Sequence, residues 1–157
     1  MNKKYLNLYN NLIRFTRNKS LYKKSDITET FSDRLTIFLL HFAFFLKNYK
    51  KNNSKKELQD FYDFVFRQIE LSVREIGYGD ASINKRMKEY VNFMHSIIKN
   101  IESWEKLSLN EKLVFFNNYI NNNRESSFYV DYFEKYTIYL SKKTFNYFTK
   151  DVISLKF

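Results

Sequence analysis

The sequence contains no cysteine, no proline and only two glycines, Gly77 and Gly79, among 157 residues. Without cysteine, disulfides, cysteine-ligated zinc sites and thiol nucleophiles are excluded. Tight β-hairpins and phosphate-binding loops depend on glycine and proline, because their turns need a positive or a preset φ. Long helices joined through polar caps need neither residue, so the composition predicts an all-α protein.

The chain is strongly basic, with 27 basic and 17 acidic residues and a formal net charge of +10. Such an excess suits a surface that binds nucleic acid or an anionic membrane. Lys, Asn, Ile, Tyr and Phe are abundant while Ala, Gly, Pro and Arg are scarce, which is typical of an AT-rich genome. We ascribe most of the charge to this codon bias and the remainder to a membrane-surface or nucleic-acid role.

Apolar residues recur at helical spacing along most of the chain. The pattern predicts one compact domain over residues 1–157 with about six helices, near 3–17, 35–46, 54–76, 82–104, 108–121 and 126–152. No heptad pattern persists over three periods, which argues against a coiled coil. Residues 1–25 lack Asp and Glu, as a mitochondrial transit peptide does, but we interpret this segment as the first helix.

The most apolar stretch is 35–46, which as a helix covers roughly 18 Å against a hydrocarbon core of ~30 Å. We therefore interpret it as a central core helix, in which His41 is a buried residue that makes one hydrogen bond. In the alternative interpretation, part of the same helix is exposed and forms an apolar surface that binds a client or a membrane. The candidate side chains for that surface are Phe38, His41, Phe42 and Phe45.

Several polar residues have the spacing of helix caps. Ser54 with Glu57, and Ser108 with Glu111, are typical of capping boxes. Gly77 is placed to end a helix in the left-handed conformation, and Asp80 or Ser82 to cap the next one. Ser126 or Ser127 is expected to begin the last long helix.

The segment 73–88 combines both glycines with a basic helix start. The chain must turn between Ile76 and Asp80, while Lys85 and Lys88 share one face of the following helix. These features predict a rigid, cationic corner, whereas the plain alternative is an interhelix turn. A phosphate-binding loop does not fit, because the joint lacks the G-x-x-x-x-G-K-[ST] pattern and a preceding strand. The candidate partner-binding residues are Arg74, Glu75, Gly77, Tyr78, Gly79, Asp80, Lys85, Arg86 and Lys88.

This joint resembles the hallmark of the ubiquinol–cytochrome c chaperone family, an Arg-Glu-x-Gly-x-Gly-Asp turn followed by a Lys-rich helix start. The resemblance is strongest over residues 8–104, and the helices expected in 108–152 match in pattern alone. At 93–96 the chain has Phe-Met-His-Ser where family members often have Phe-Tyr-Gly-Arg. The further matching residues are Leu8-Tyr9, Leu21-Tyr22, Phe31, Asp33-Arg34 and Leu40-His41.

The resemblance implies a non-catalytic assembly chaperone without a cofactor. Its client would be newly made cytochrome b or another subunit of the ubiquinol–cytochrome c reductase complex, whose assembly it would promote. It would act peripherally at the cytoplasmic face of a bacterial inner membrane. The alternative location is the matrix side of the mitochondrial inner membrane.

A competing hypothesis is a basic RNA- or ribosome-binding module, in which lysines contact phosphates and aromatics stack on bases. Nucleic acid is the less favoured partner, while a ribosome contact stays open. A small enzyme is disfavoured, because Glu70 and Arg74 are spaced as an ordinary i,i+4 ion pair and no catalytic or metal-ligand spacing is present. The aromatics of the last helix, with Lys142, Lys143 and Lys150, suit either an anionic lipid surface or a codon-biased core.

Overall fold

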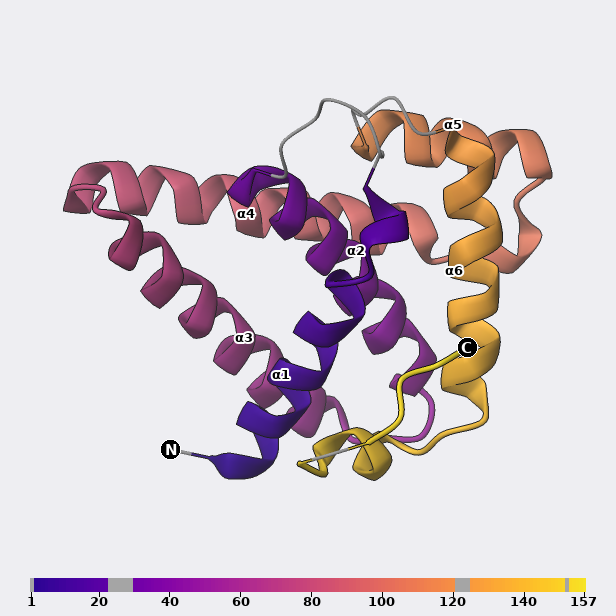
Figure 1. Cartoon of the computed structure of the whole chain (residues 1–157), viewed down its shortest axis with the longest axis horizontal. Helices are drawn as coiled ribbons and strands as arrows, with labels where there is room; N and C mark the ends of the chain where they lie inside the picture. Colours follow the sequence, from indigo (N-terminus) through magenta and orange to yellow (C-terminus); the bar gives the residue numbers. More distant parts are fainter. Residues whose placement is uncertain (1, 23–29, 121–124, 152) are drawn as a thin grey trace.

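The computed structural model describes residues 2–22, 30–120, 125–151 and 153–157. Over these ranges the chain folds into six α-helices and three short 3-10 turns without a strand, which confirms the all-α prediction (Figure 1). The elements are α1 (Lys3–Thr16), η1 (Lys19–Leu21), α2 (Phe31–Tyr49), α3 (Lys55–Ile76), α4 (Asp80–Ile101), η2 (Trp104–Lys106), α5 (Leu109–Tyr119), α6 (Ser126–Ser141) and η3 (Phe145–Thr149).

Helix α2 is the centre of the fold. Eleven of its nineteen residues are buried, and it packs against α1, α4 and α6. The helix begins at Phe31, earlier than its apolar run, because Thr30 and Asp33 form a capping box at its start. This confirms the interpretation of 35–46 as a core helix. None of the helices in the described ranges has the length and hydropathy that crossing a bilayer requires.

Helix α6 and the turn η3 close the other side of the core. Four aromatic side chains of α6 are buried, and the chain then reverses so that Phe145 and Phe148 of η3 pack beneath α1. The expected helix 126–152 is therefore wrong beyond Ser141. Thr144 accepts a hydrogen bond from the Tyr147 backbone N–H, which begins η3 and fixes the reversal.

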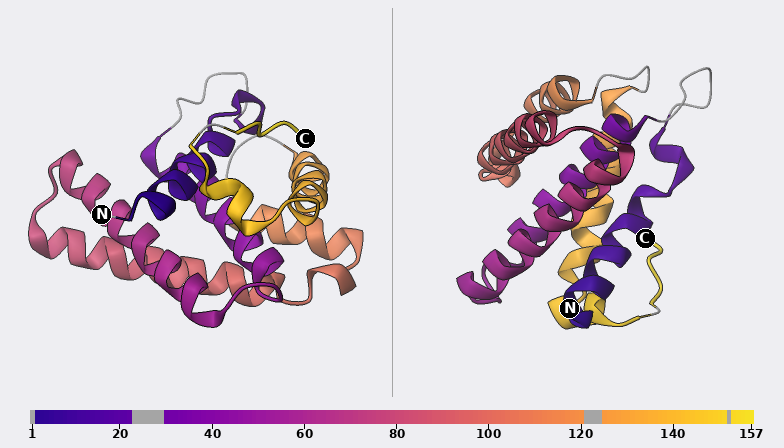
Figure 2. Two further views of the ribbon diagram at one scale, coloured as in Figure 1. Left: turned by 90° about the horizontal axis from the view of Figure 1, so that it is seen from below. Right: turned by 90° about the vertical axis from the view of Figure 1, so that its left-hand side faces the viewer.

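Helices α3 and α4 form a V whose apex projects from the rest of the molecule (Figures 1 and 2). Helix α4 also lies across α2, which anchors the far arm of the V to the core. We call the apex, residues 70–89, the α3–α4 tip.

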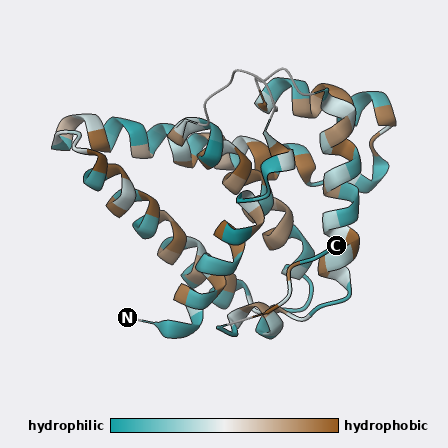
Figure 3. Ribbon diagram, viewed as in Figure 1, coloured by the Kyte–Doolittle hydropathy of each residue, from teal (hydrophilic) through white to brown (hydrophobic). Residues whose placement is uncertain are grey.

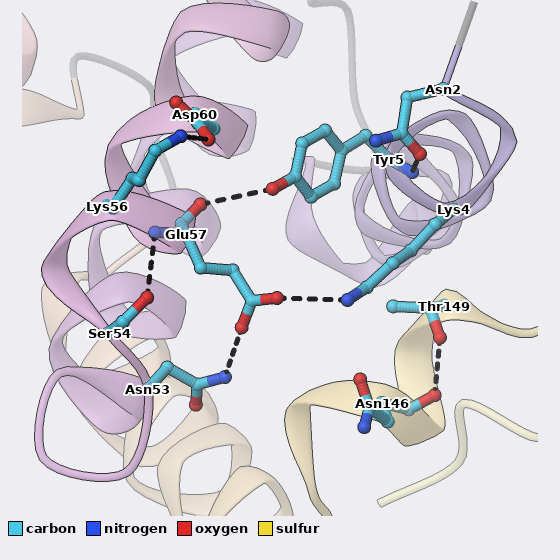
Figure 4. A network of polar contacts seen from close by, with 10 residues as sticks. All are labelled: Asn2, Lys4, Tyr5, Asn53, Ser54, Lys56, Glu57, Asp60, Asn146 and Thr149. Atoms are coloured by element: carbon cyan, nitrogen blue, oxygen red, sulfur yellow. Dashed lines mark hydrogen bonds and ion pairs between the residues drawn. The ribbon is translucent and has the colours of Figure 1, made fainter.

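The predicted caps are partly correct. Ser108 and Glu111 form a complete capping box at α5. Ser54 accepts the Glu57 N–H at α3, but the Glu57 carboxylate bonds to Asn53 and Lys4 instead of reaching back to Ser54 (Figure 4). The expectation of a serine cap at α6 is wrong, because Glu125 occupies the cap position without a side-chain hydrogen bond.

Candidate functional site

The two glycines of the α3–α4 tip have different conformations. Gly77 ends α3 in the left-handed region at φ 103°, and its N–H donates to the Arg74 carbonyl at 3.0 Å. Gly79 occupies the cap position of α4 at φ −73°, with no side-chain cap. The expected cap by Asp80 or Ser82 is therefore wrong. Asp80 is the first residue of α4, where its charge still complements the positive end of the helix.

Arg74 joins the two arms of the tip. Its Nη1 donates to Asp80 Oδ1 at 3.0 Å, and its Nε lies 3.6 Å from Glu70 Oε2. The predicted Glu70–Arg74 ion pair is confirmed. All three side chains are at least two-fifths exposed, so these pairs contribute less than about 1 kcal/mol of stability each.

The tip carries no net charge. Residues 70–89 contain four cations and four carboxylates. Arg74 is engaged by two carboxylates, and the Arg86 guanidinium lies over the Tyr78 ring at 3.8 Å. Lys85 and Lys88 are exposed. Within the narrower segment 73–88 four basic residues stand against two acidic ones, so the cationic corner stays a prediction.

The tip instead exposes apolar side chains. Leu71 is 47% exposed, Ile76 50% and Tyr78 37%. Only Tyr78 was among the sequence candidates, although Leu71 and Ile76 visibly lie off the buried stripe of α3 that holds Ile69 and Val73. Exposed apolar and aromatic side chains beside charges of both signs suit a protein-binding surface.

The four α2 candidates do not form a surface. Phe38 is 5% exposed, and His41, Phe42 and Phe45 are fully buried. The proposed apolar client or membrane surface on this helix is therefore wrong in this fold, because α1, α4 and α6 cover it.

His41 is a buried core residue with two hydrogen-bond partners rather than the expected one. Its Nδ1 lies 2.7 Å from the Ile37 carbonyl, and its Nε2 lies 2.7 Å from Tyr132 Oη. Burial lowers the pKa of His41 to about 4, against the hydrogen bond that its ring donates to the Ile37 carbonyl, which raises it. The imidazole is therefore neutral at physiological pH and serves the α2–α6 interface.

A shallow groove of about 340 Å³ lies between the end of α4 and α5. Tyr119 lines it, and its hydroxyl bonds to Asn100 and Ser96. Amides and one carboxylate, Glu111, supply most of its polar groups. In the described part of the chain no three metal-ligating side chains gather.

The fold and the tip together define a class: a helical protein with a projecting apex that exposes apolar side chains. The family model of the ubiquinol–cytochrome C chaperones matches residues 23–104, which include α2, α3, the tip and α4. This is more than half of the chain, and the chain belongs to the ubiquinol–cytochrome c chaperone family. No curated protein and no solved structure was found to match it.

Membership indicates a chaperone role in the assembly of a respiratory complex, associated with a bacterial or mitochondrial membrane. The match begins at residue 23, so α1 lies before it and α5 and α6 lie after it.

Proposed function

We propose that this chain binds cytochrome b and promotes assembly of the ubiquinol–cytochrome c reductase complex, without catalysis. It works stoichiometrically and peripherally at the cytoplasmic face of a bacterial inner membrane, or on the matrix side in mitochondria. The whole chain acts as one functional domain. The family match over residues 23–104 is the observation that carries this proposal.

The α3–α4 tip is the client-binding site in this proposal. It lies inside the matched region and projects from the core, so a partner reaches it without disturbing the packing. Leu71, Ile76 and Tyr78 offer apolar contacts, and Arg86 holds the Tyr78 ring in place. The charges of both signs around them pair with polar groups of a client at the rim of the contact.

Co-purification tests this proposal. A tagged chain is recovered from detergent-solubilised membranes of its own cells, and the cytochrome b that accompanies it is quantified by mass spectrometry. Replacing Leu71 and Ile76 with Glu should lower recovered cytochrome b by about tenfold or more, since charged groups would replace apolar contacts.

The matched control replaces Ile138 and Leu109 with Glu, because these side chains are 55% and 65% exposed and lie outside the tip. That variant should recover cytochrome b as the unmodified chain does. Absence of cytochrome b from the unmodified preparation would reject the client. An equal loss in both variants would reject the tip as its binding site.

A further inference from the structure

Most of the positive charge of the chain is gathered at one end of the fold. Three segments meet there: the start of α1 (2–5), the α2–α3 joint with the first turns of α3 (50–60), and the α6–η3 region (142–151). They hold nine lysines against three carboxylates, a net charge of +6 out of +10 for the whole chain. We call this surface the lysine end, and its members are Lys3, Lys4, Lys50, Lys51, Lys55, Lys56, Lys142, Lys143 and Lys150.

Contacts between distant residues hold these segments together. Tyr49 Oη, at the end of α2, donates to the Lys143 carbonyl at 2.9 Å and to the Leu140 carbonyl at 3.1 Å. Lys4 Nζ donates to Glu57 Oε2 at 2.9 Å and lies 5.5 Å from the Phe145 ring centroid. Figure 4 shows Lys4 and Glu57 bridging α1 and α3, with η3 alongside. The end faces the viewer in the left view of Figure 2.

The lysines of this end are largely free to meet an external anion. Within the described residues Lys3, Lys50, Lys51, Lys55 and Lys142 are exposed and take part in no ion pair. Lys56 pairs with Asp60, and only Lys4 is held by a carboxylate of another element. The segments joining the helices are hydrophilic at this edge, as Figure 3 shows.

Two tyrosines pack beside lysines of this end. Tyr139 and Tyr147 are half-buried, and both hydroxyls donate to the Ser154 carbonyl, at 2.7 and 3.1 Å. Lys143 Nζ lies over the Tyr147 ring at 4.5 Å, and Lys150 Nζ lies 5.9 Å from the same ring. Tyrosines with a buried body and a polar tip are typical of the boundary between water and a membrane.

We propose that the lysine end is the surface by which this chain docks on a bilayer containing anionic phospholipid. The proposal deepens the peripheral membrane role proposed above and rests on it for its biological meaning. The positive charge of this end attracts the anionic lipid headgroups, and each lysine near an anionic bilayer strengthens binding about fivefold. Docking there leaves the α3–α4 tip, on another side of the molecule, open to a client (Figure 1).

Lipid fits this surface better than RNA for two reasons. None of the seven arginines of the chain lies in these segments, although arginine is the residue of choice for nucleic-acid recognition. The exposed large apolar side chains of the described chain, Tyr78 among them, all lie outside the lysine end, and its half-buried rings Tyr139 and Tyr147 are covered by Lys143, so a base finds no open ring for stacking. Because the exposed apolar side chains lie elsewhere and lysines dominate this end, we expect the chain to dock without deep insertion, through electrostatic attraction that salt abolishes.

Vesicle co-sedimentation with the purified full-length chain tests the proposal. The chain should bind vesicles in which about a third of the lipid is phosphatidylglycerol, and not pure phosphatidylcholine vesicles. Binding should disappear between ~0.1 M and ~1 M salt, because the Debye length falls from ~10 Å to ~3 Å. Replacing Lys51, Lys55 and Lys142 with Glu should weaken binding on the order of a hundredfold.

The matched control replaces three other exposed lysines, Lys19, Lys99 and Lys135, with Glu, so both triple variants carry the same net charge. It should bind anionic vesicles within about threefold of the unmodified chain, since these lysines lie outside the three segments that form the lysine end. Circular dichroism establishes that both variants fold. The salt titration of the unmodified chain tests the proposal without any variant.

Three results would overturn the proposal: no binding to anionic vesicles at low salt, equal weakening by the two triple variants, or a gel shift with single-stranded RNA that depends on the lysine end in the absence of vesicle binding. The assay contains no client. Its failure therefore leaves the cytochrome b proposal to the co-purification experiment, and the tip variant Leu71→Glu/Ile76→Glu should bind vesicles normally.

Discussion

The α3–α4 tip and the lysine end are both helix joints, yet they differ in how charge is arranged. The tip has basic residues close together in sequence, but acidic residues of the adjoining turns balance them to zero over 70–89. The lysine end consists of lysines in three separate segments, which packing brings together into a surface with a net charge of +6. A basic run in a sequence is therefore a poor guide to surface potential until its neighbours in space are known.

The two regions also differ in what holds them. The tip depends on a left-handed glycine and on exposed ion pairs. The lysine end depends on buried hydrogen bonds from α1 and α2 to the backbone around η3. We expect the lysine end to be sensitive to core substitutions and to pH, and the tip to be sensitive to its own backbone conformation.

The largest effect is expected from Asn11→Ala, which removes the hydrogen bonds that hold η3, part of the lysine end, against α1. Asn11 is buried, and its Nδ2 donates to the Phe148 carbonyl at 2.8 Å and to the Lys150 carbonyl at 3.0 Å. Leaving two carbonyls without this donor should cost about 2 to 4 kcal/mol of unfolding free energy, measured by urea titration. Hydrogen exchange should accelerate around η3 before it does at the tip.

Asn7→Ala is the matched control, because Asn7 is only partly buried and donates a single bond, to the Thr149 carbonyl at 3.1 Å. Its cost should stay below about 1 kcal/mol. Equal losses in the two variants would contradict the view that the buried amide anchors the lysine end.

The second effect is a loss of stability in mild acid through His41. Its folded pKa of about 4 lies below the ordinary value of 6.5, so the unfolded chain binds the proton more readily. The stability from neutral His41 is complete above pH 6.5 and is lost as the pH falls toward 4, by roughly 3 kcal/mol in total. The packing of α2 against α6, which supports the lysine end, weakens as this stability is lost.

Urea unfolding between pH ~7 and ~5 measures this slope. The variant His41→Gln should lose most of the slope, whereas His95→Gln should keep it, because His95 is exposed. A slope that survives in His41→Gln would assign the acid sensitivity to other groups.

The smallest effect is expected at the tip, from Gly77→Ala. A Cβ at position 77 would meet no atom within 4 Å, but the φ of 103° is unfavourable for alanine and should cost about 1 to 2 kcal/mol. Gly79→Ala has the same open surroundings at an ordinary φ, so its unfolding free energy should change by less than about 0.5 kcal/mol. Similar values for the two variants, measured by thermal or urea unfolding, would contradict the conformational argument.

Much of the fold could be predicted because its signals are local. The apolar run 35–46 became the core of α2, and Gly77 ends α3 in the left-handed conformation, as its position predicted. The failures are non-local. The helix expected through 152 ends at Ser141 because Phe145 and Phe148 gain more by packing under α1 than by extending the helix into solvent.

The site was predicted less well than the fold for the same reason. The α2 residues Phe38, His41, Phe42 and Phe45 looked available as a surface only because nothing in the sequence says which helices cover them. Leu71 and Ile76 were overlooked, although their exposure follows from lying off the buried stripe of α3.

By itself the sequence determined the all-α class, the central helix, the left-handed turn at Gly77 and the membership of the ubiquinol–cytochrome c chaperone family. These depend on spacings of a few residues, which reach only one turn along a helix. Only the tertiary structure decided that nine lysines from three separate segments form one surface. Electrostatic interactions act through space over roughly a Debye length, ~8–10 Å, and are indifferent to separation along the chain.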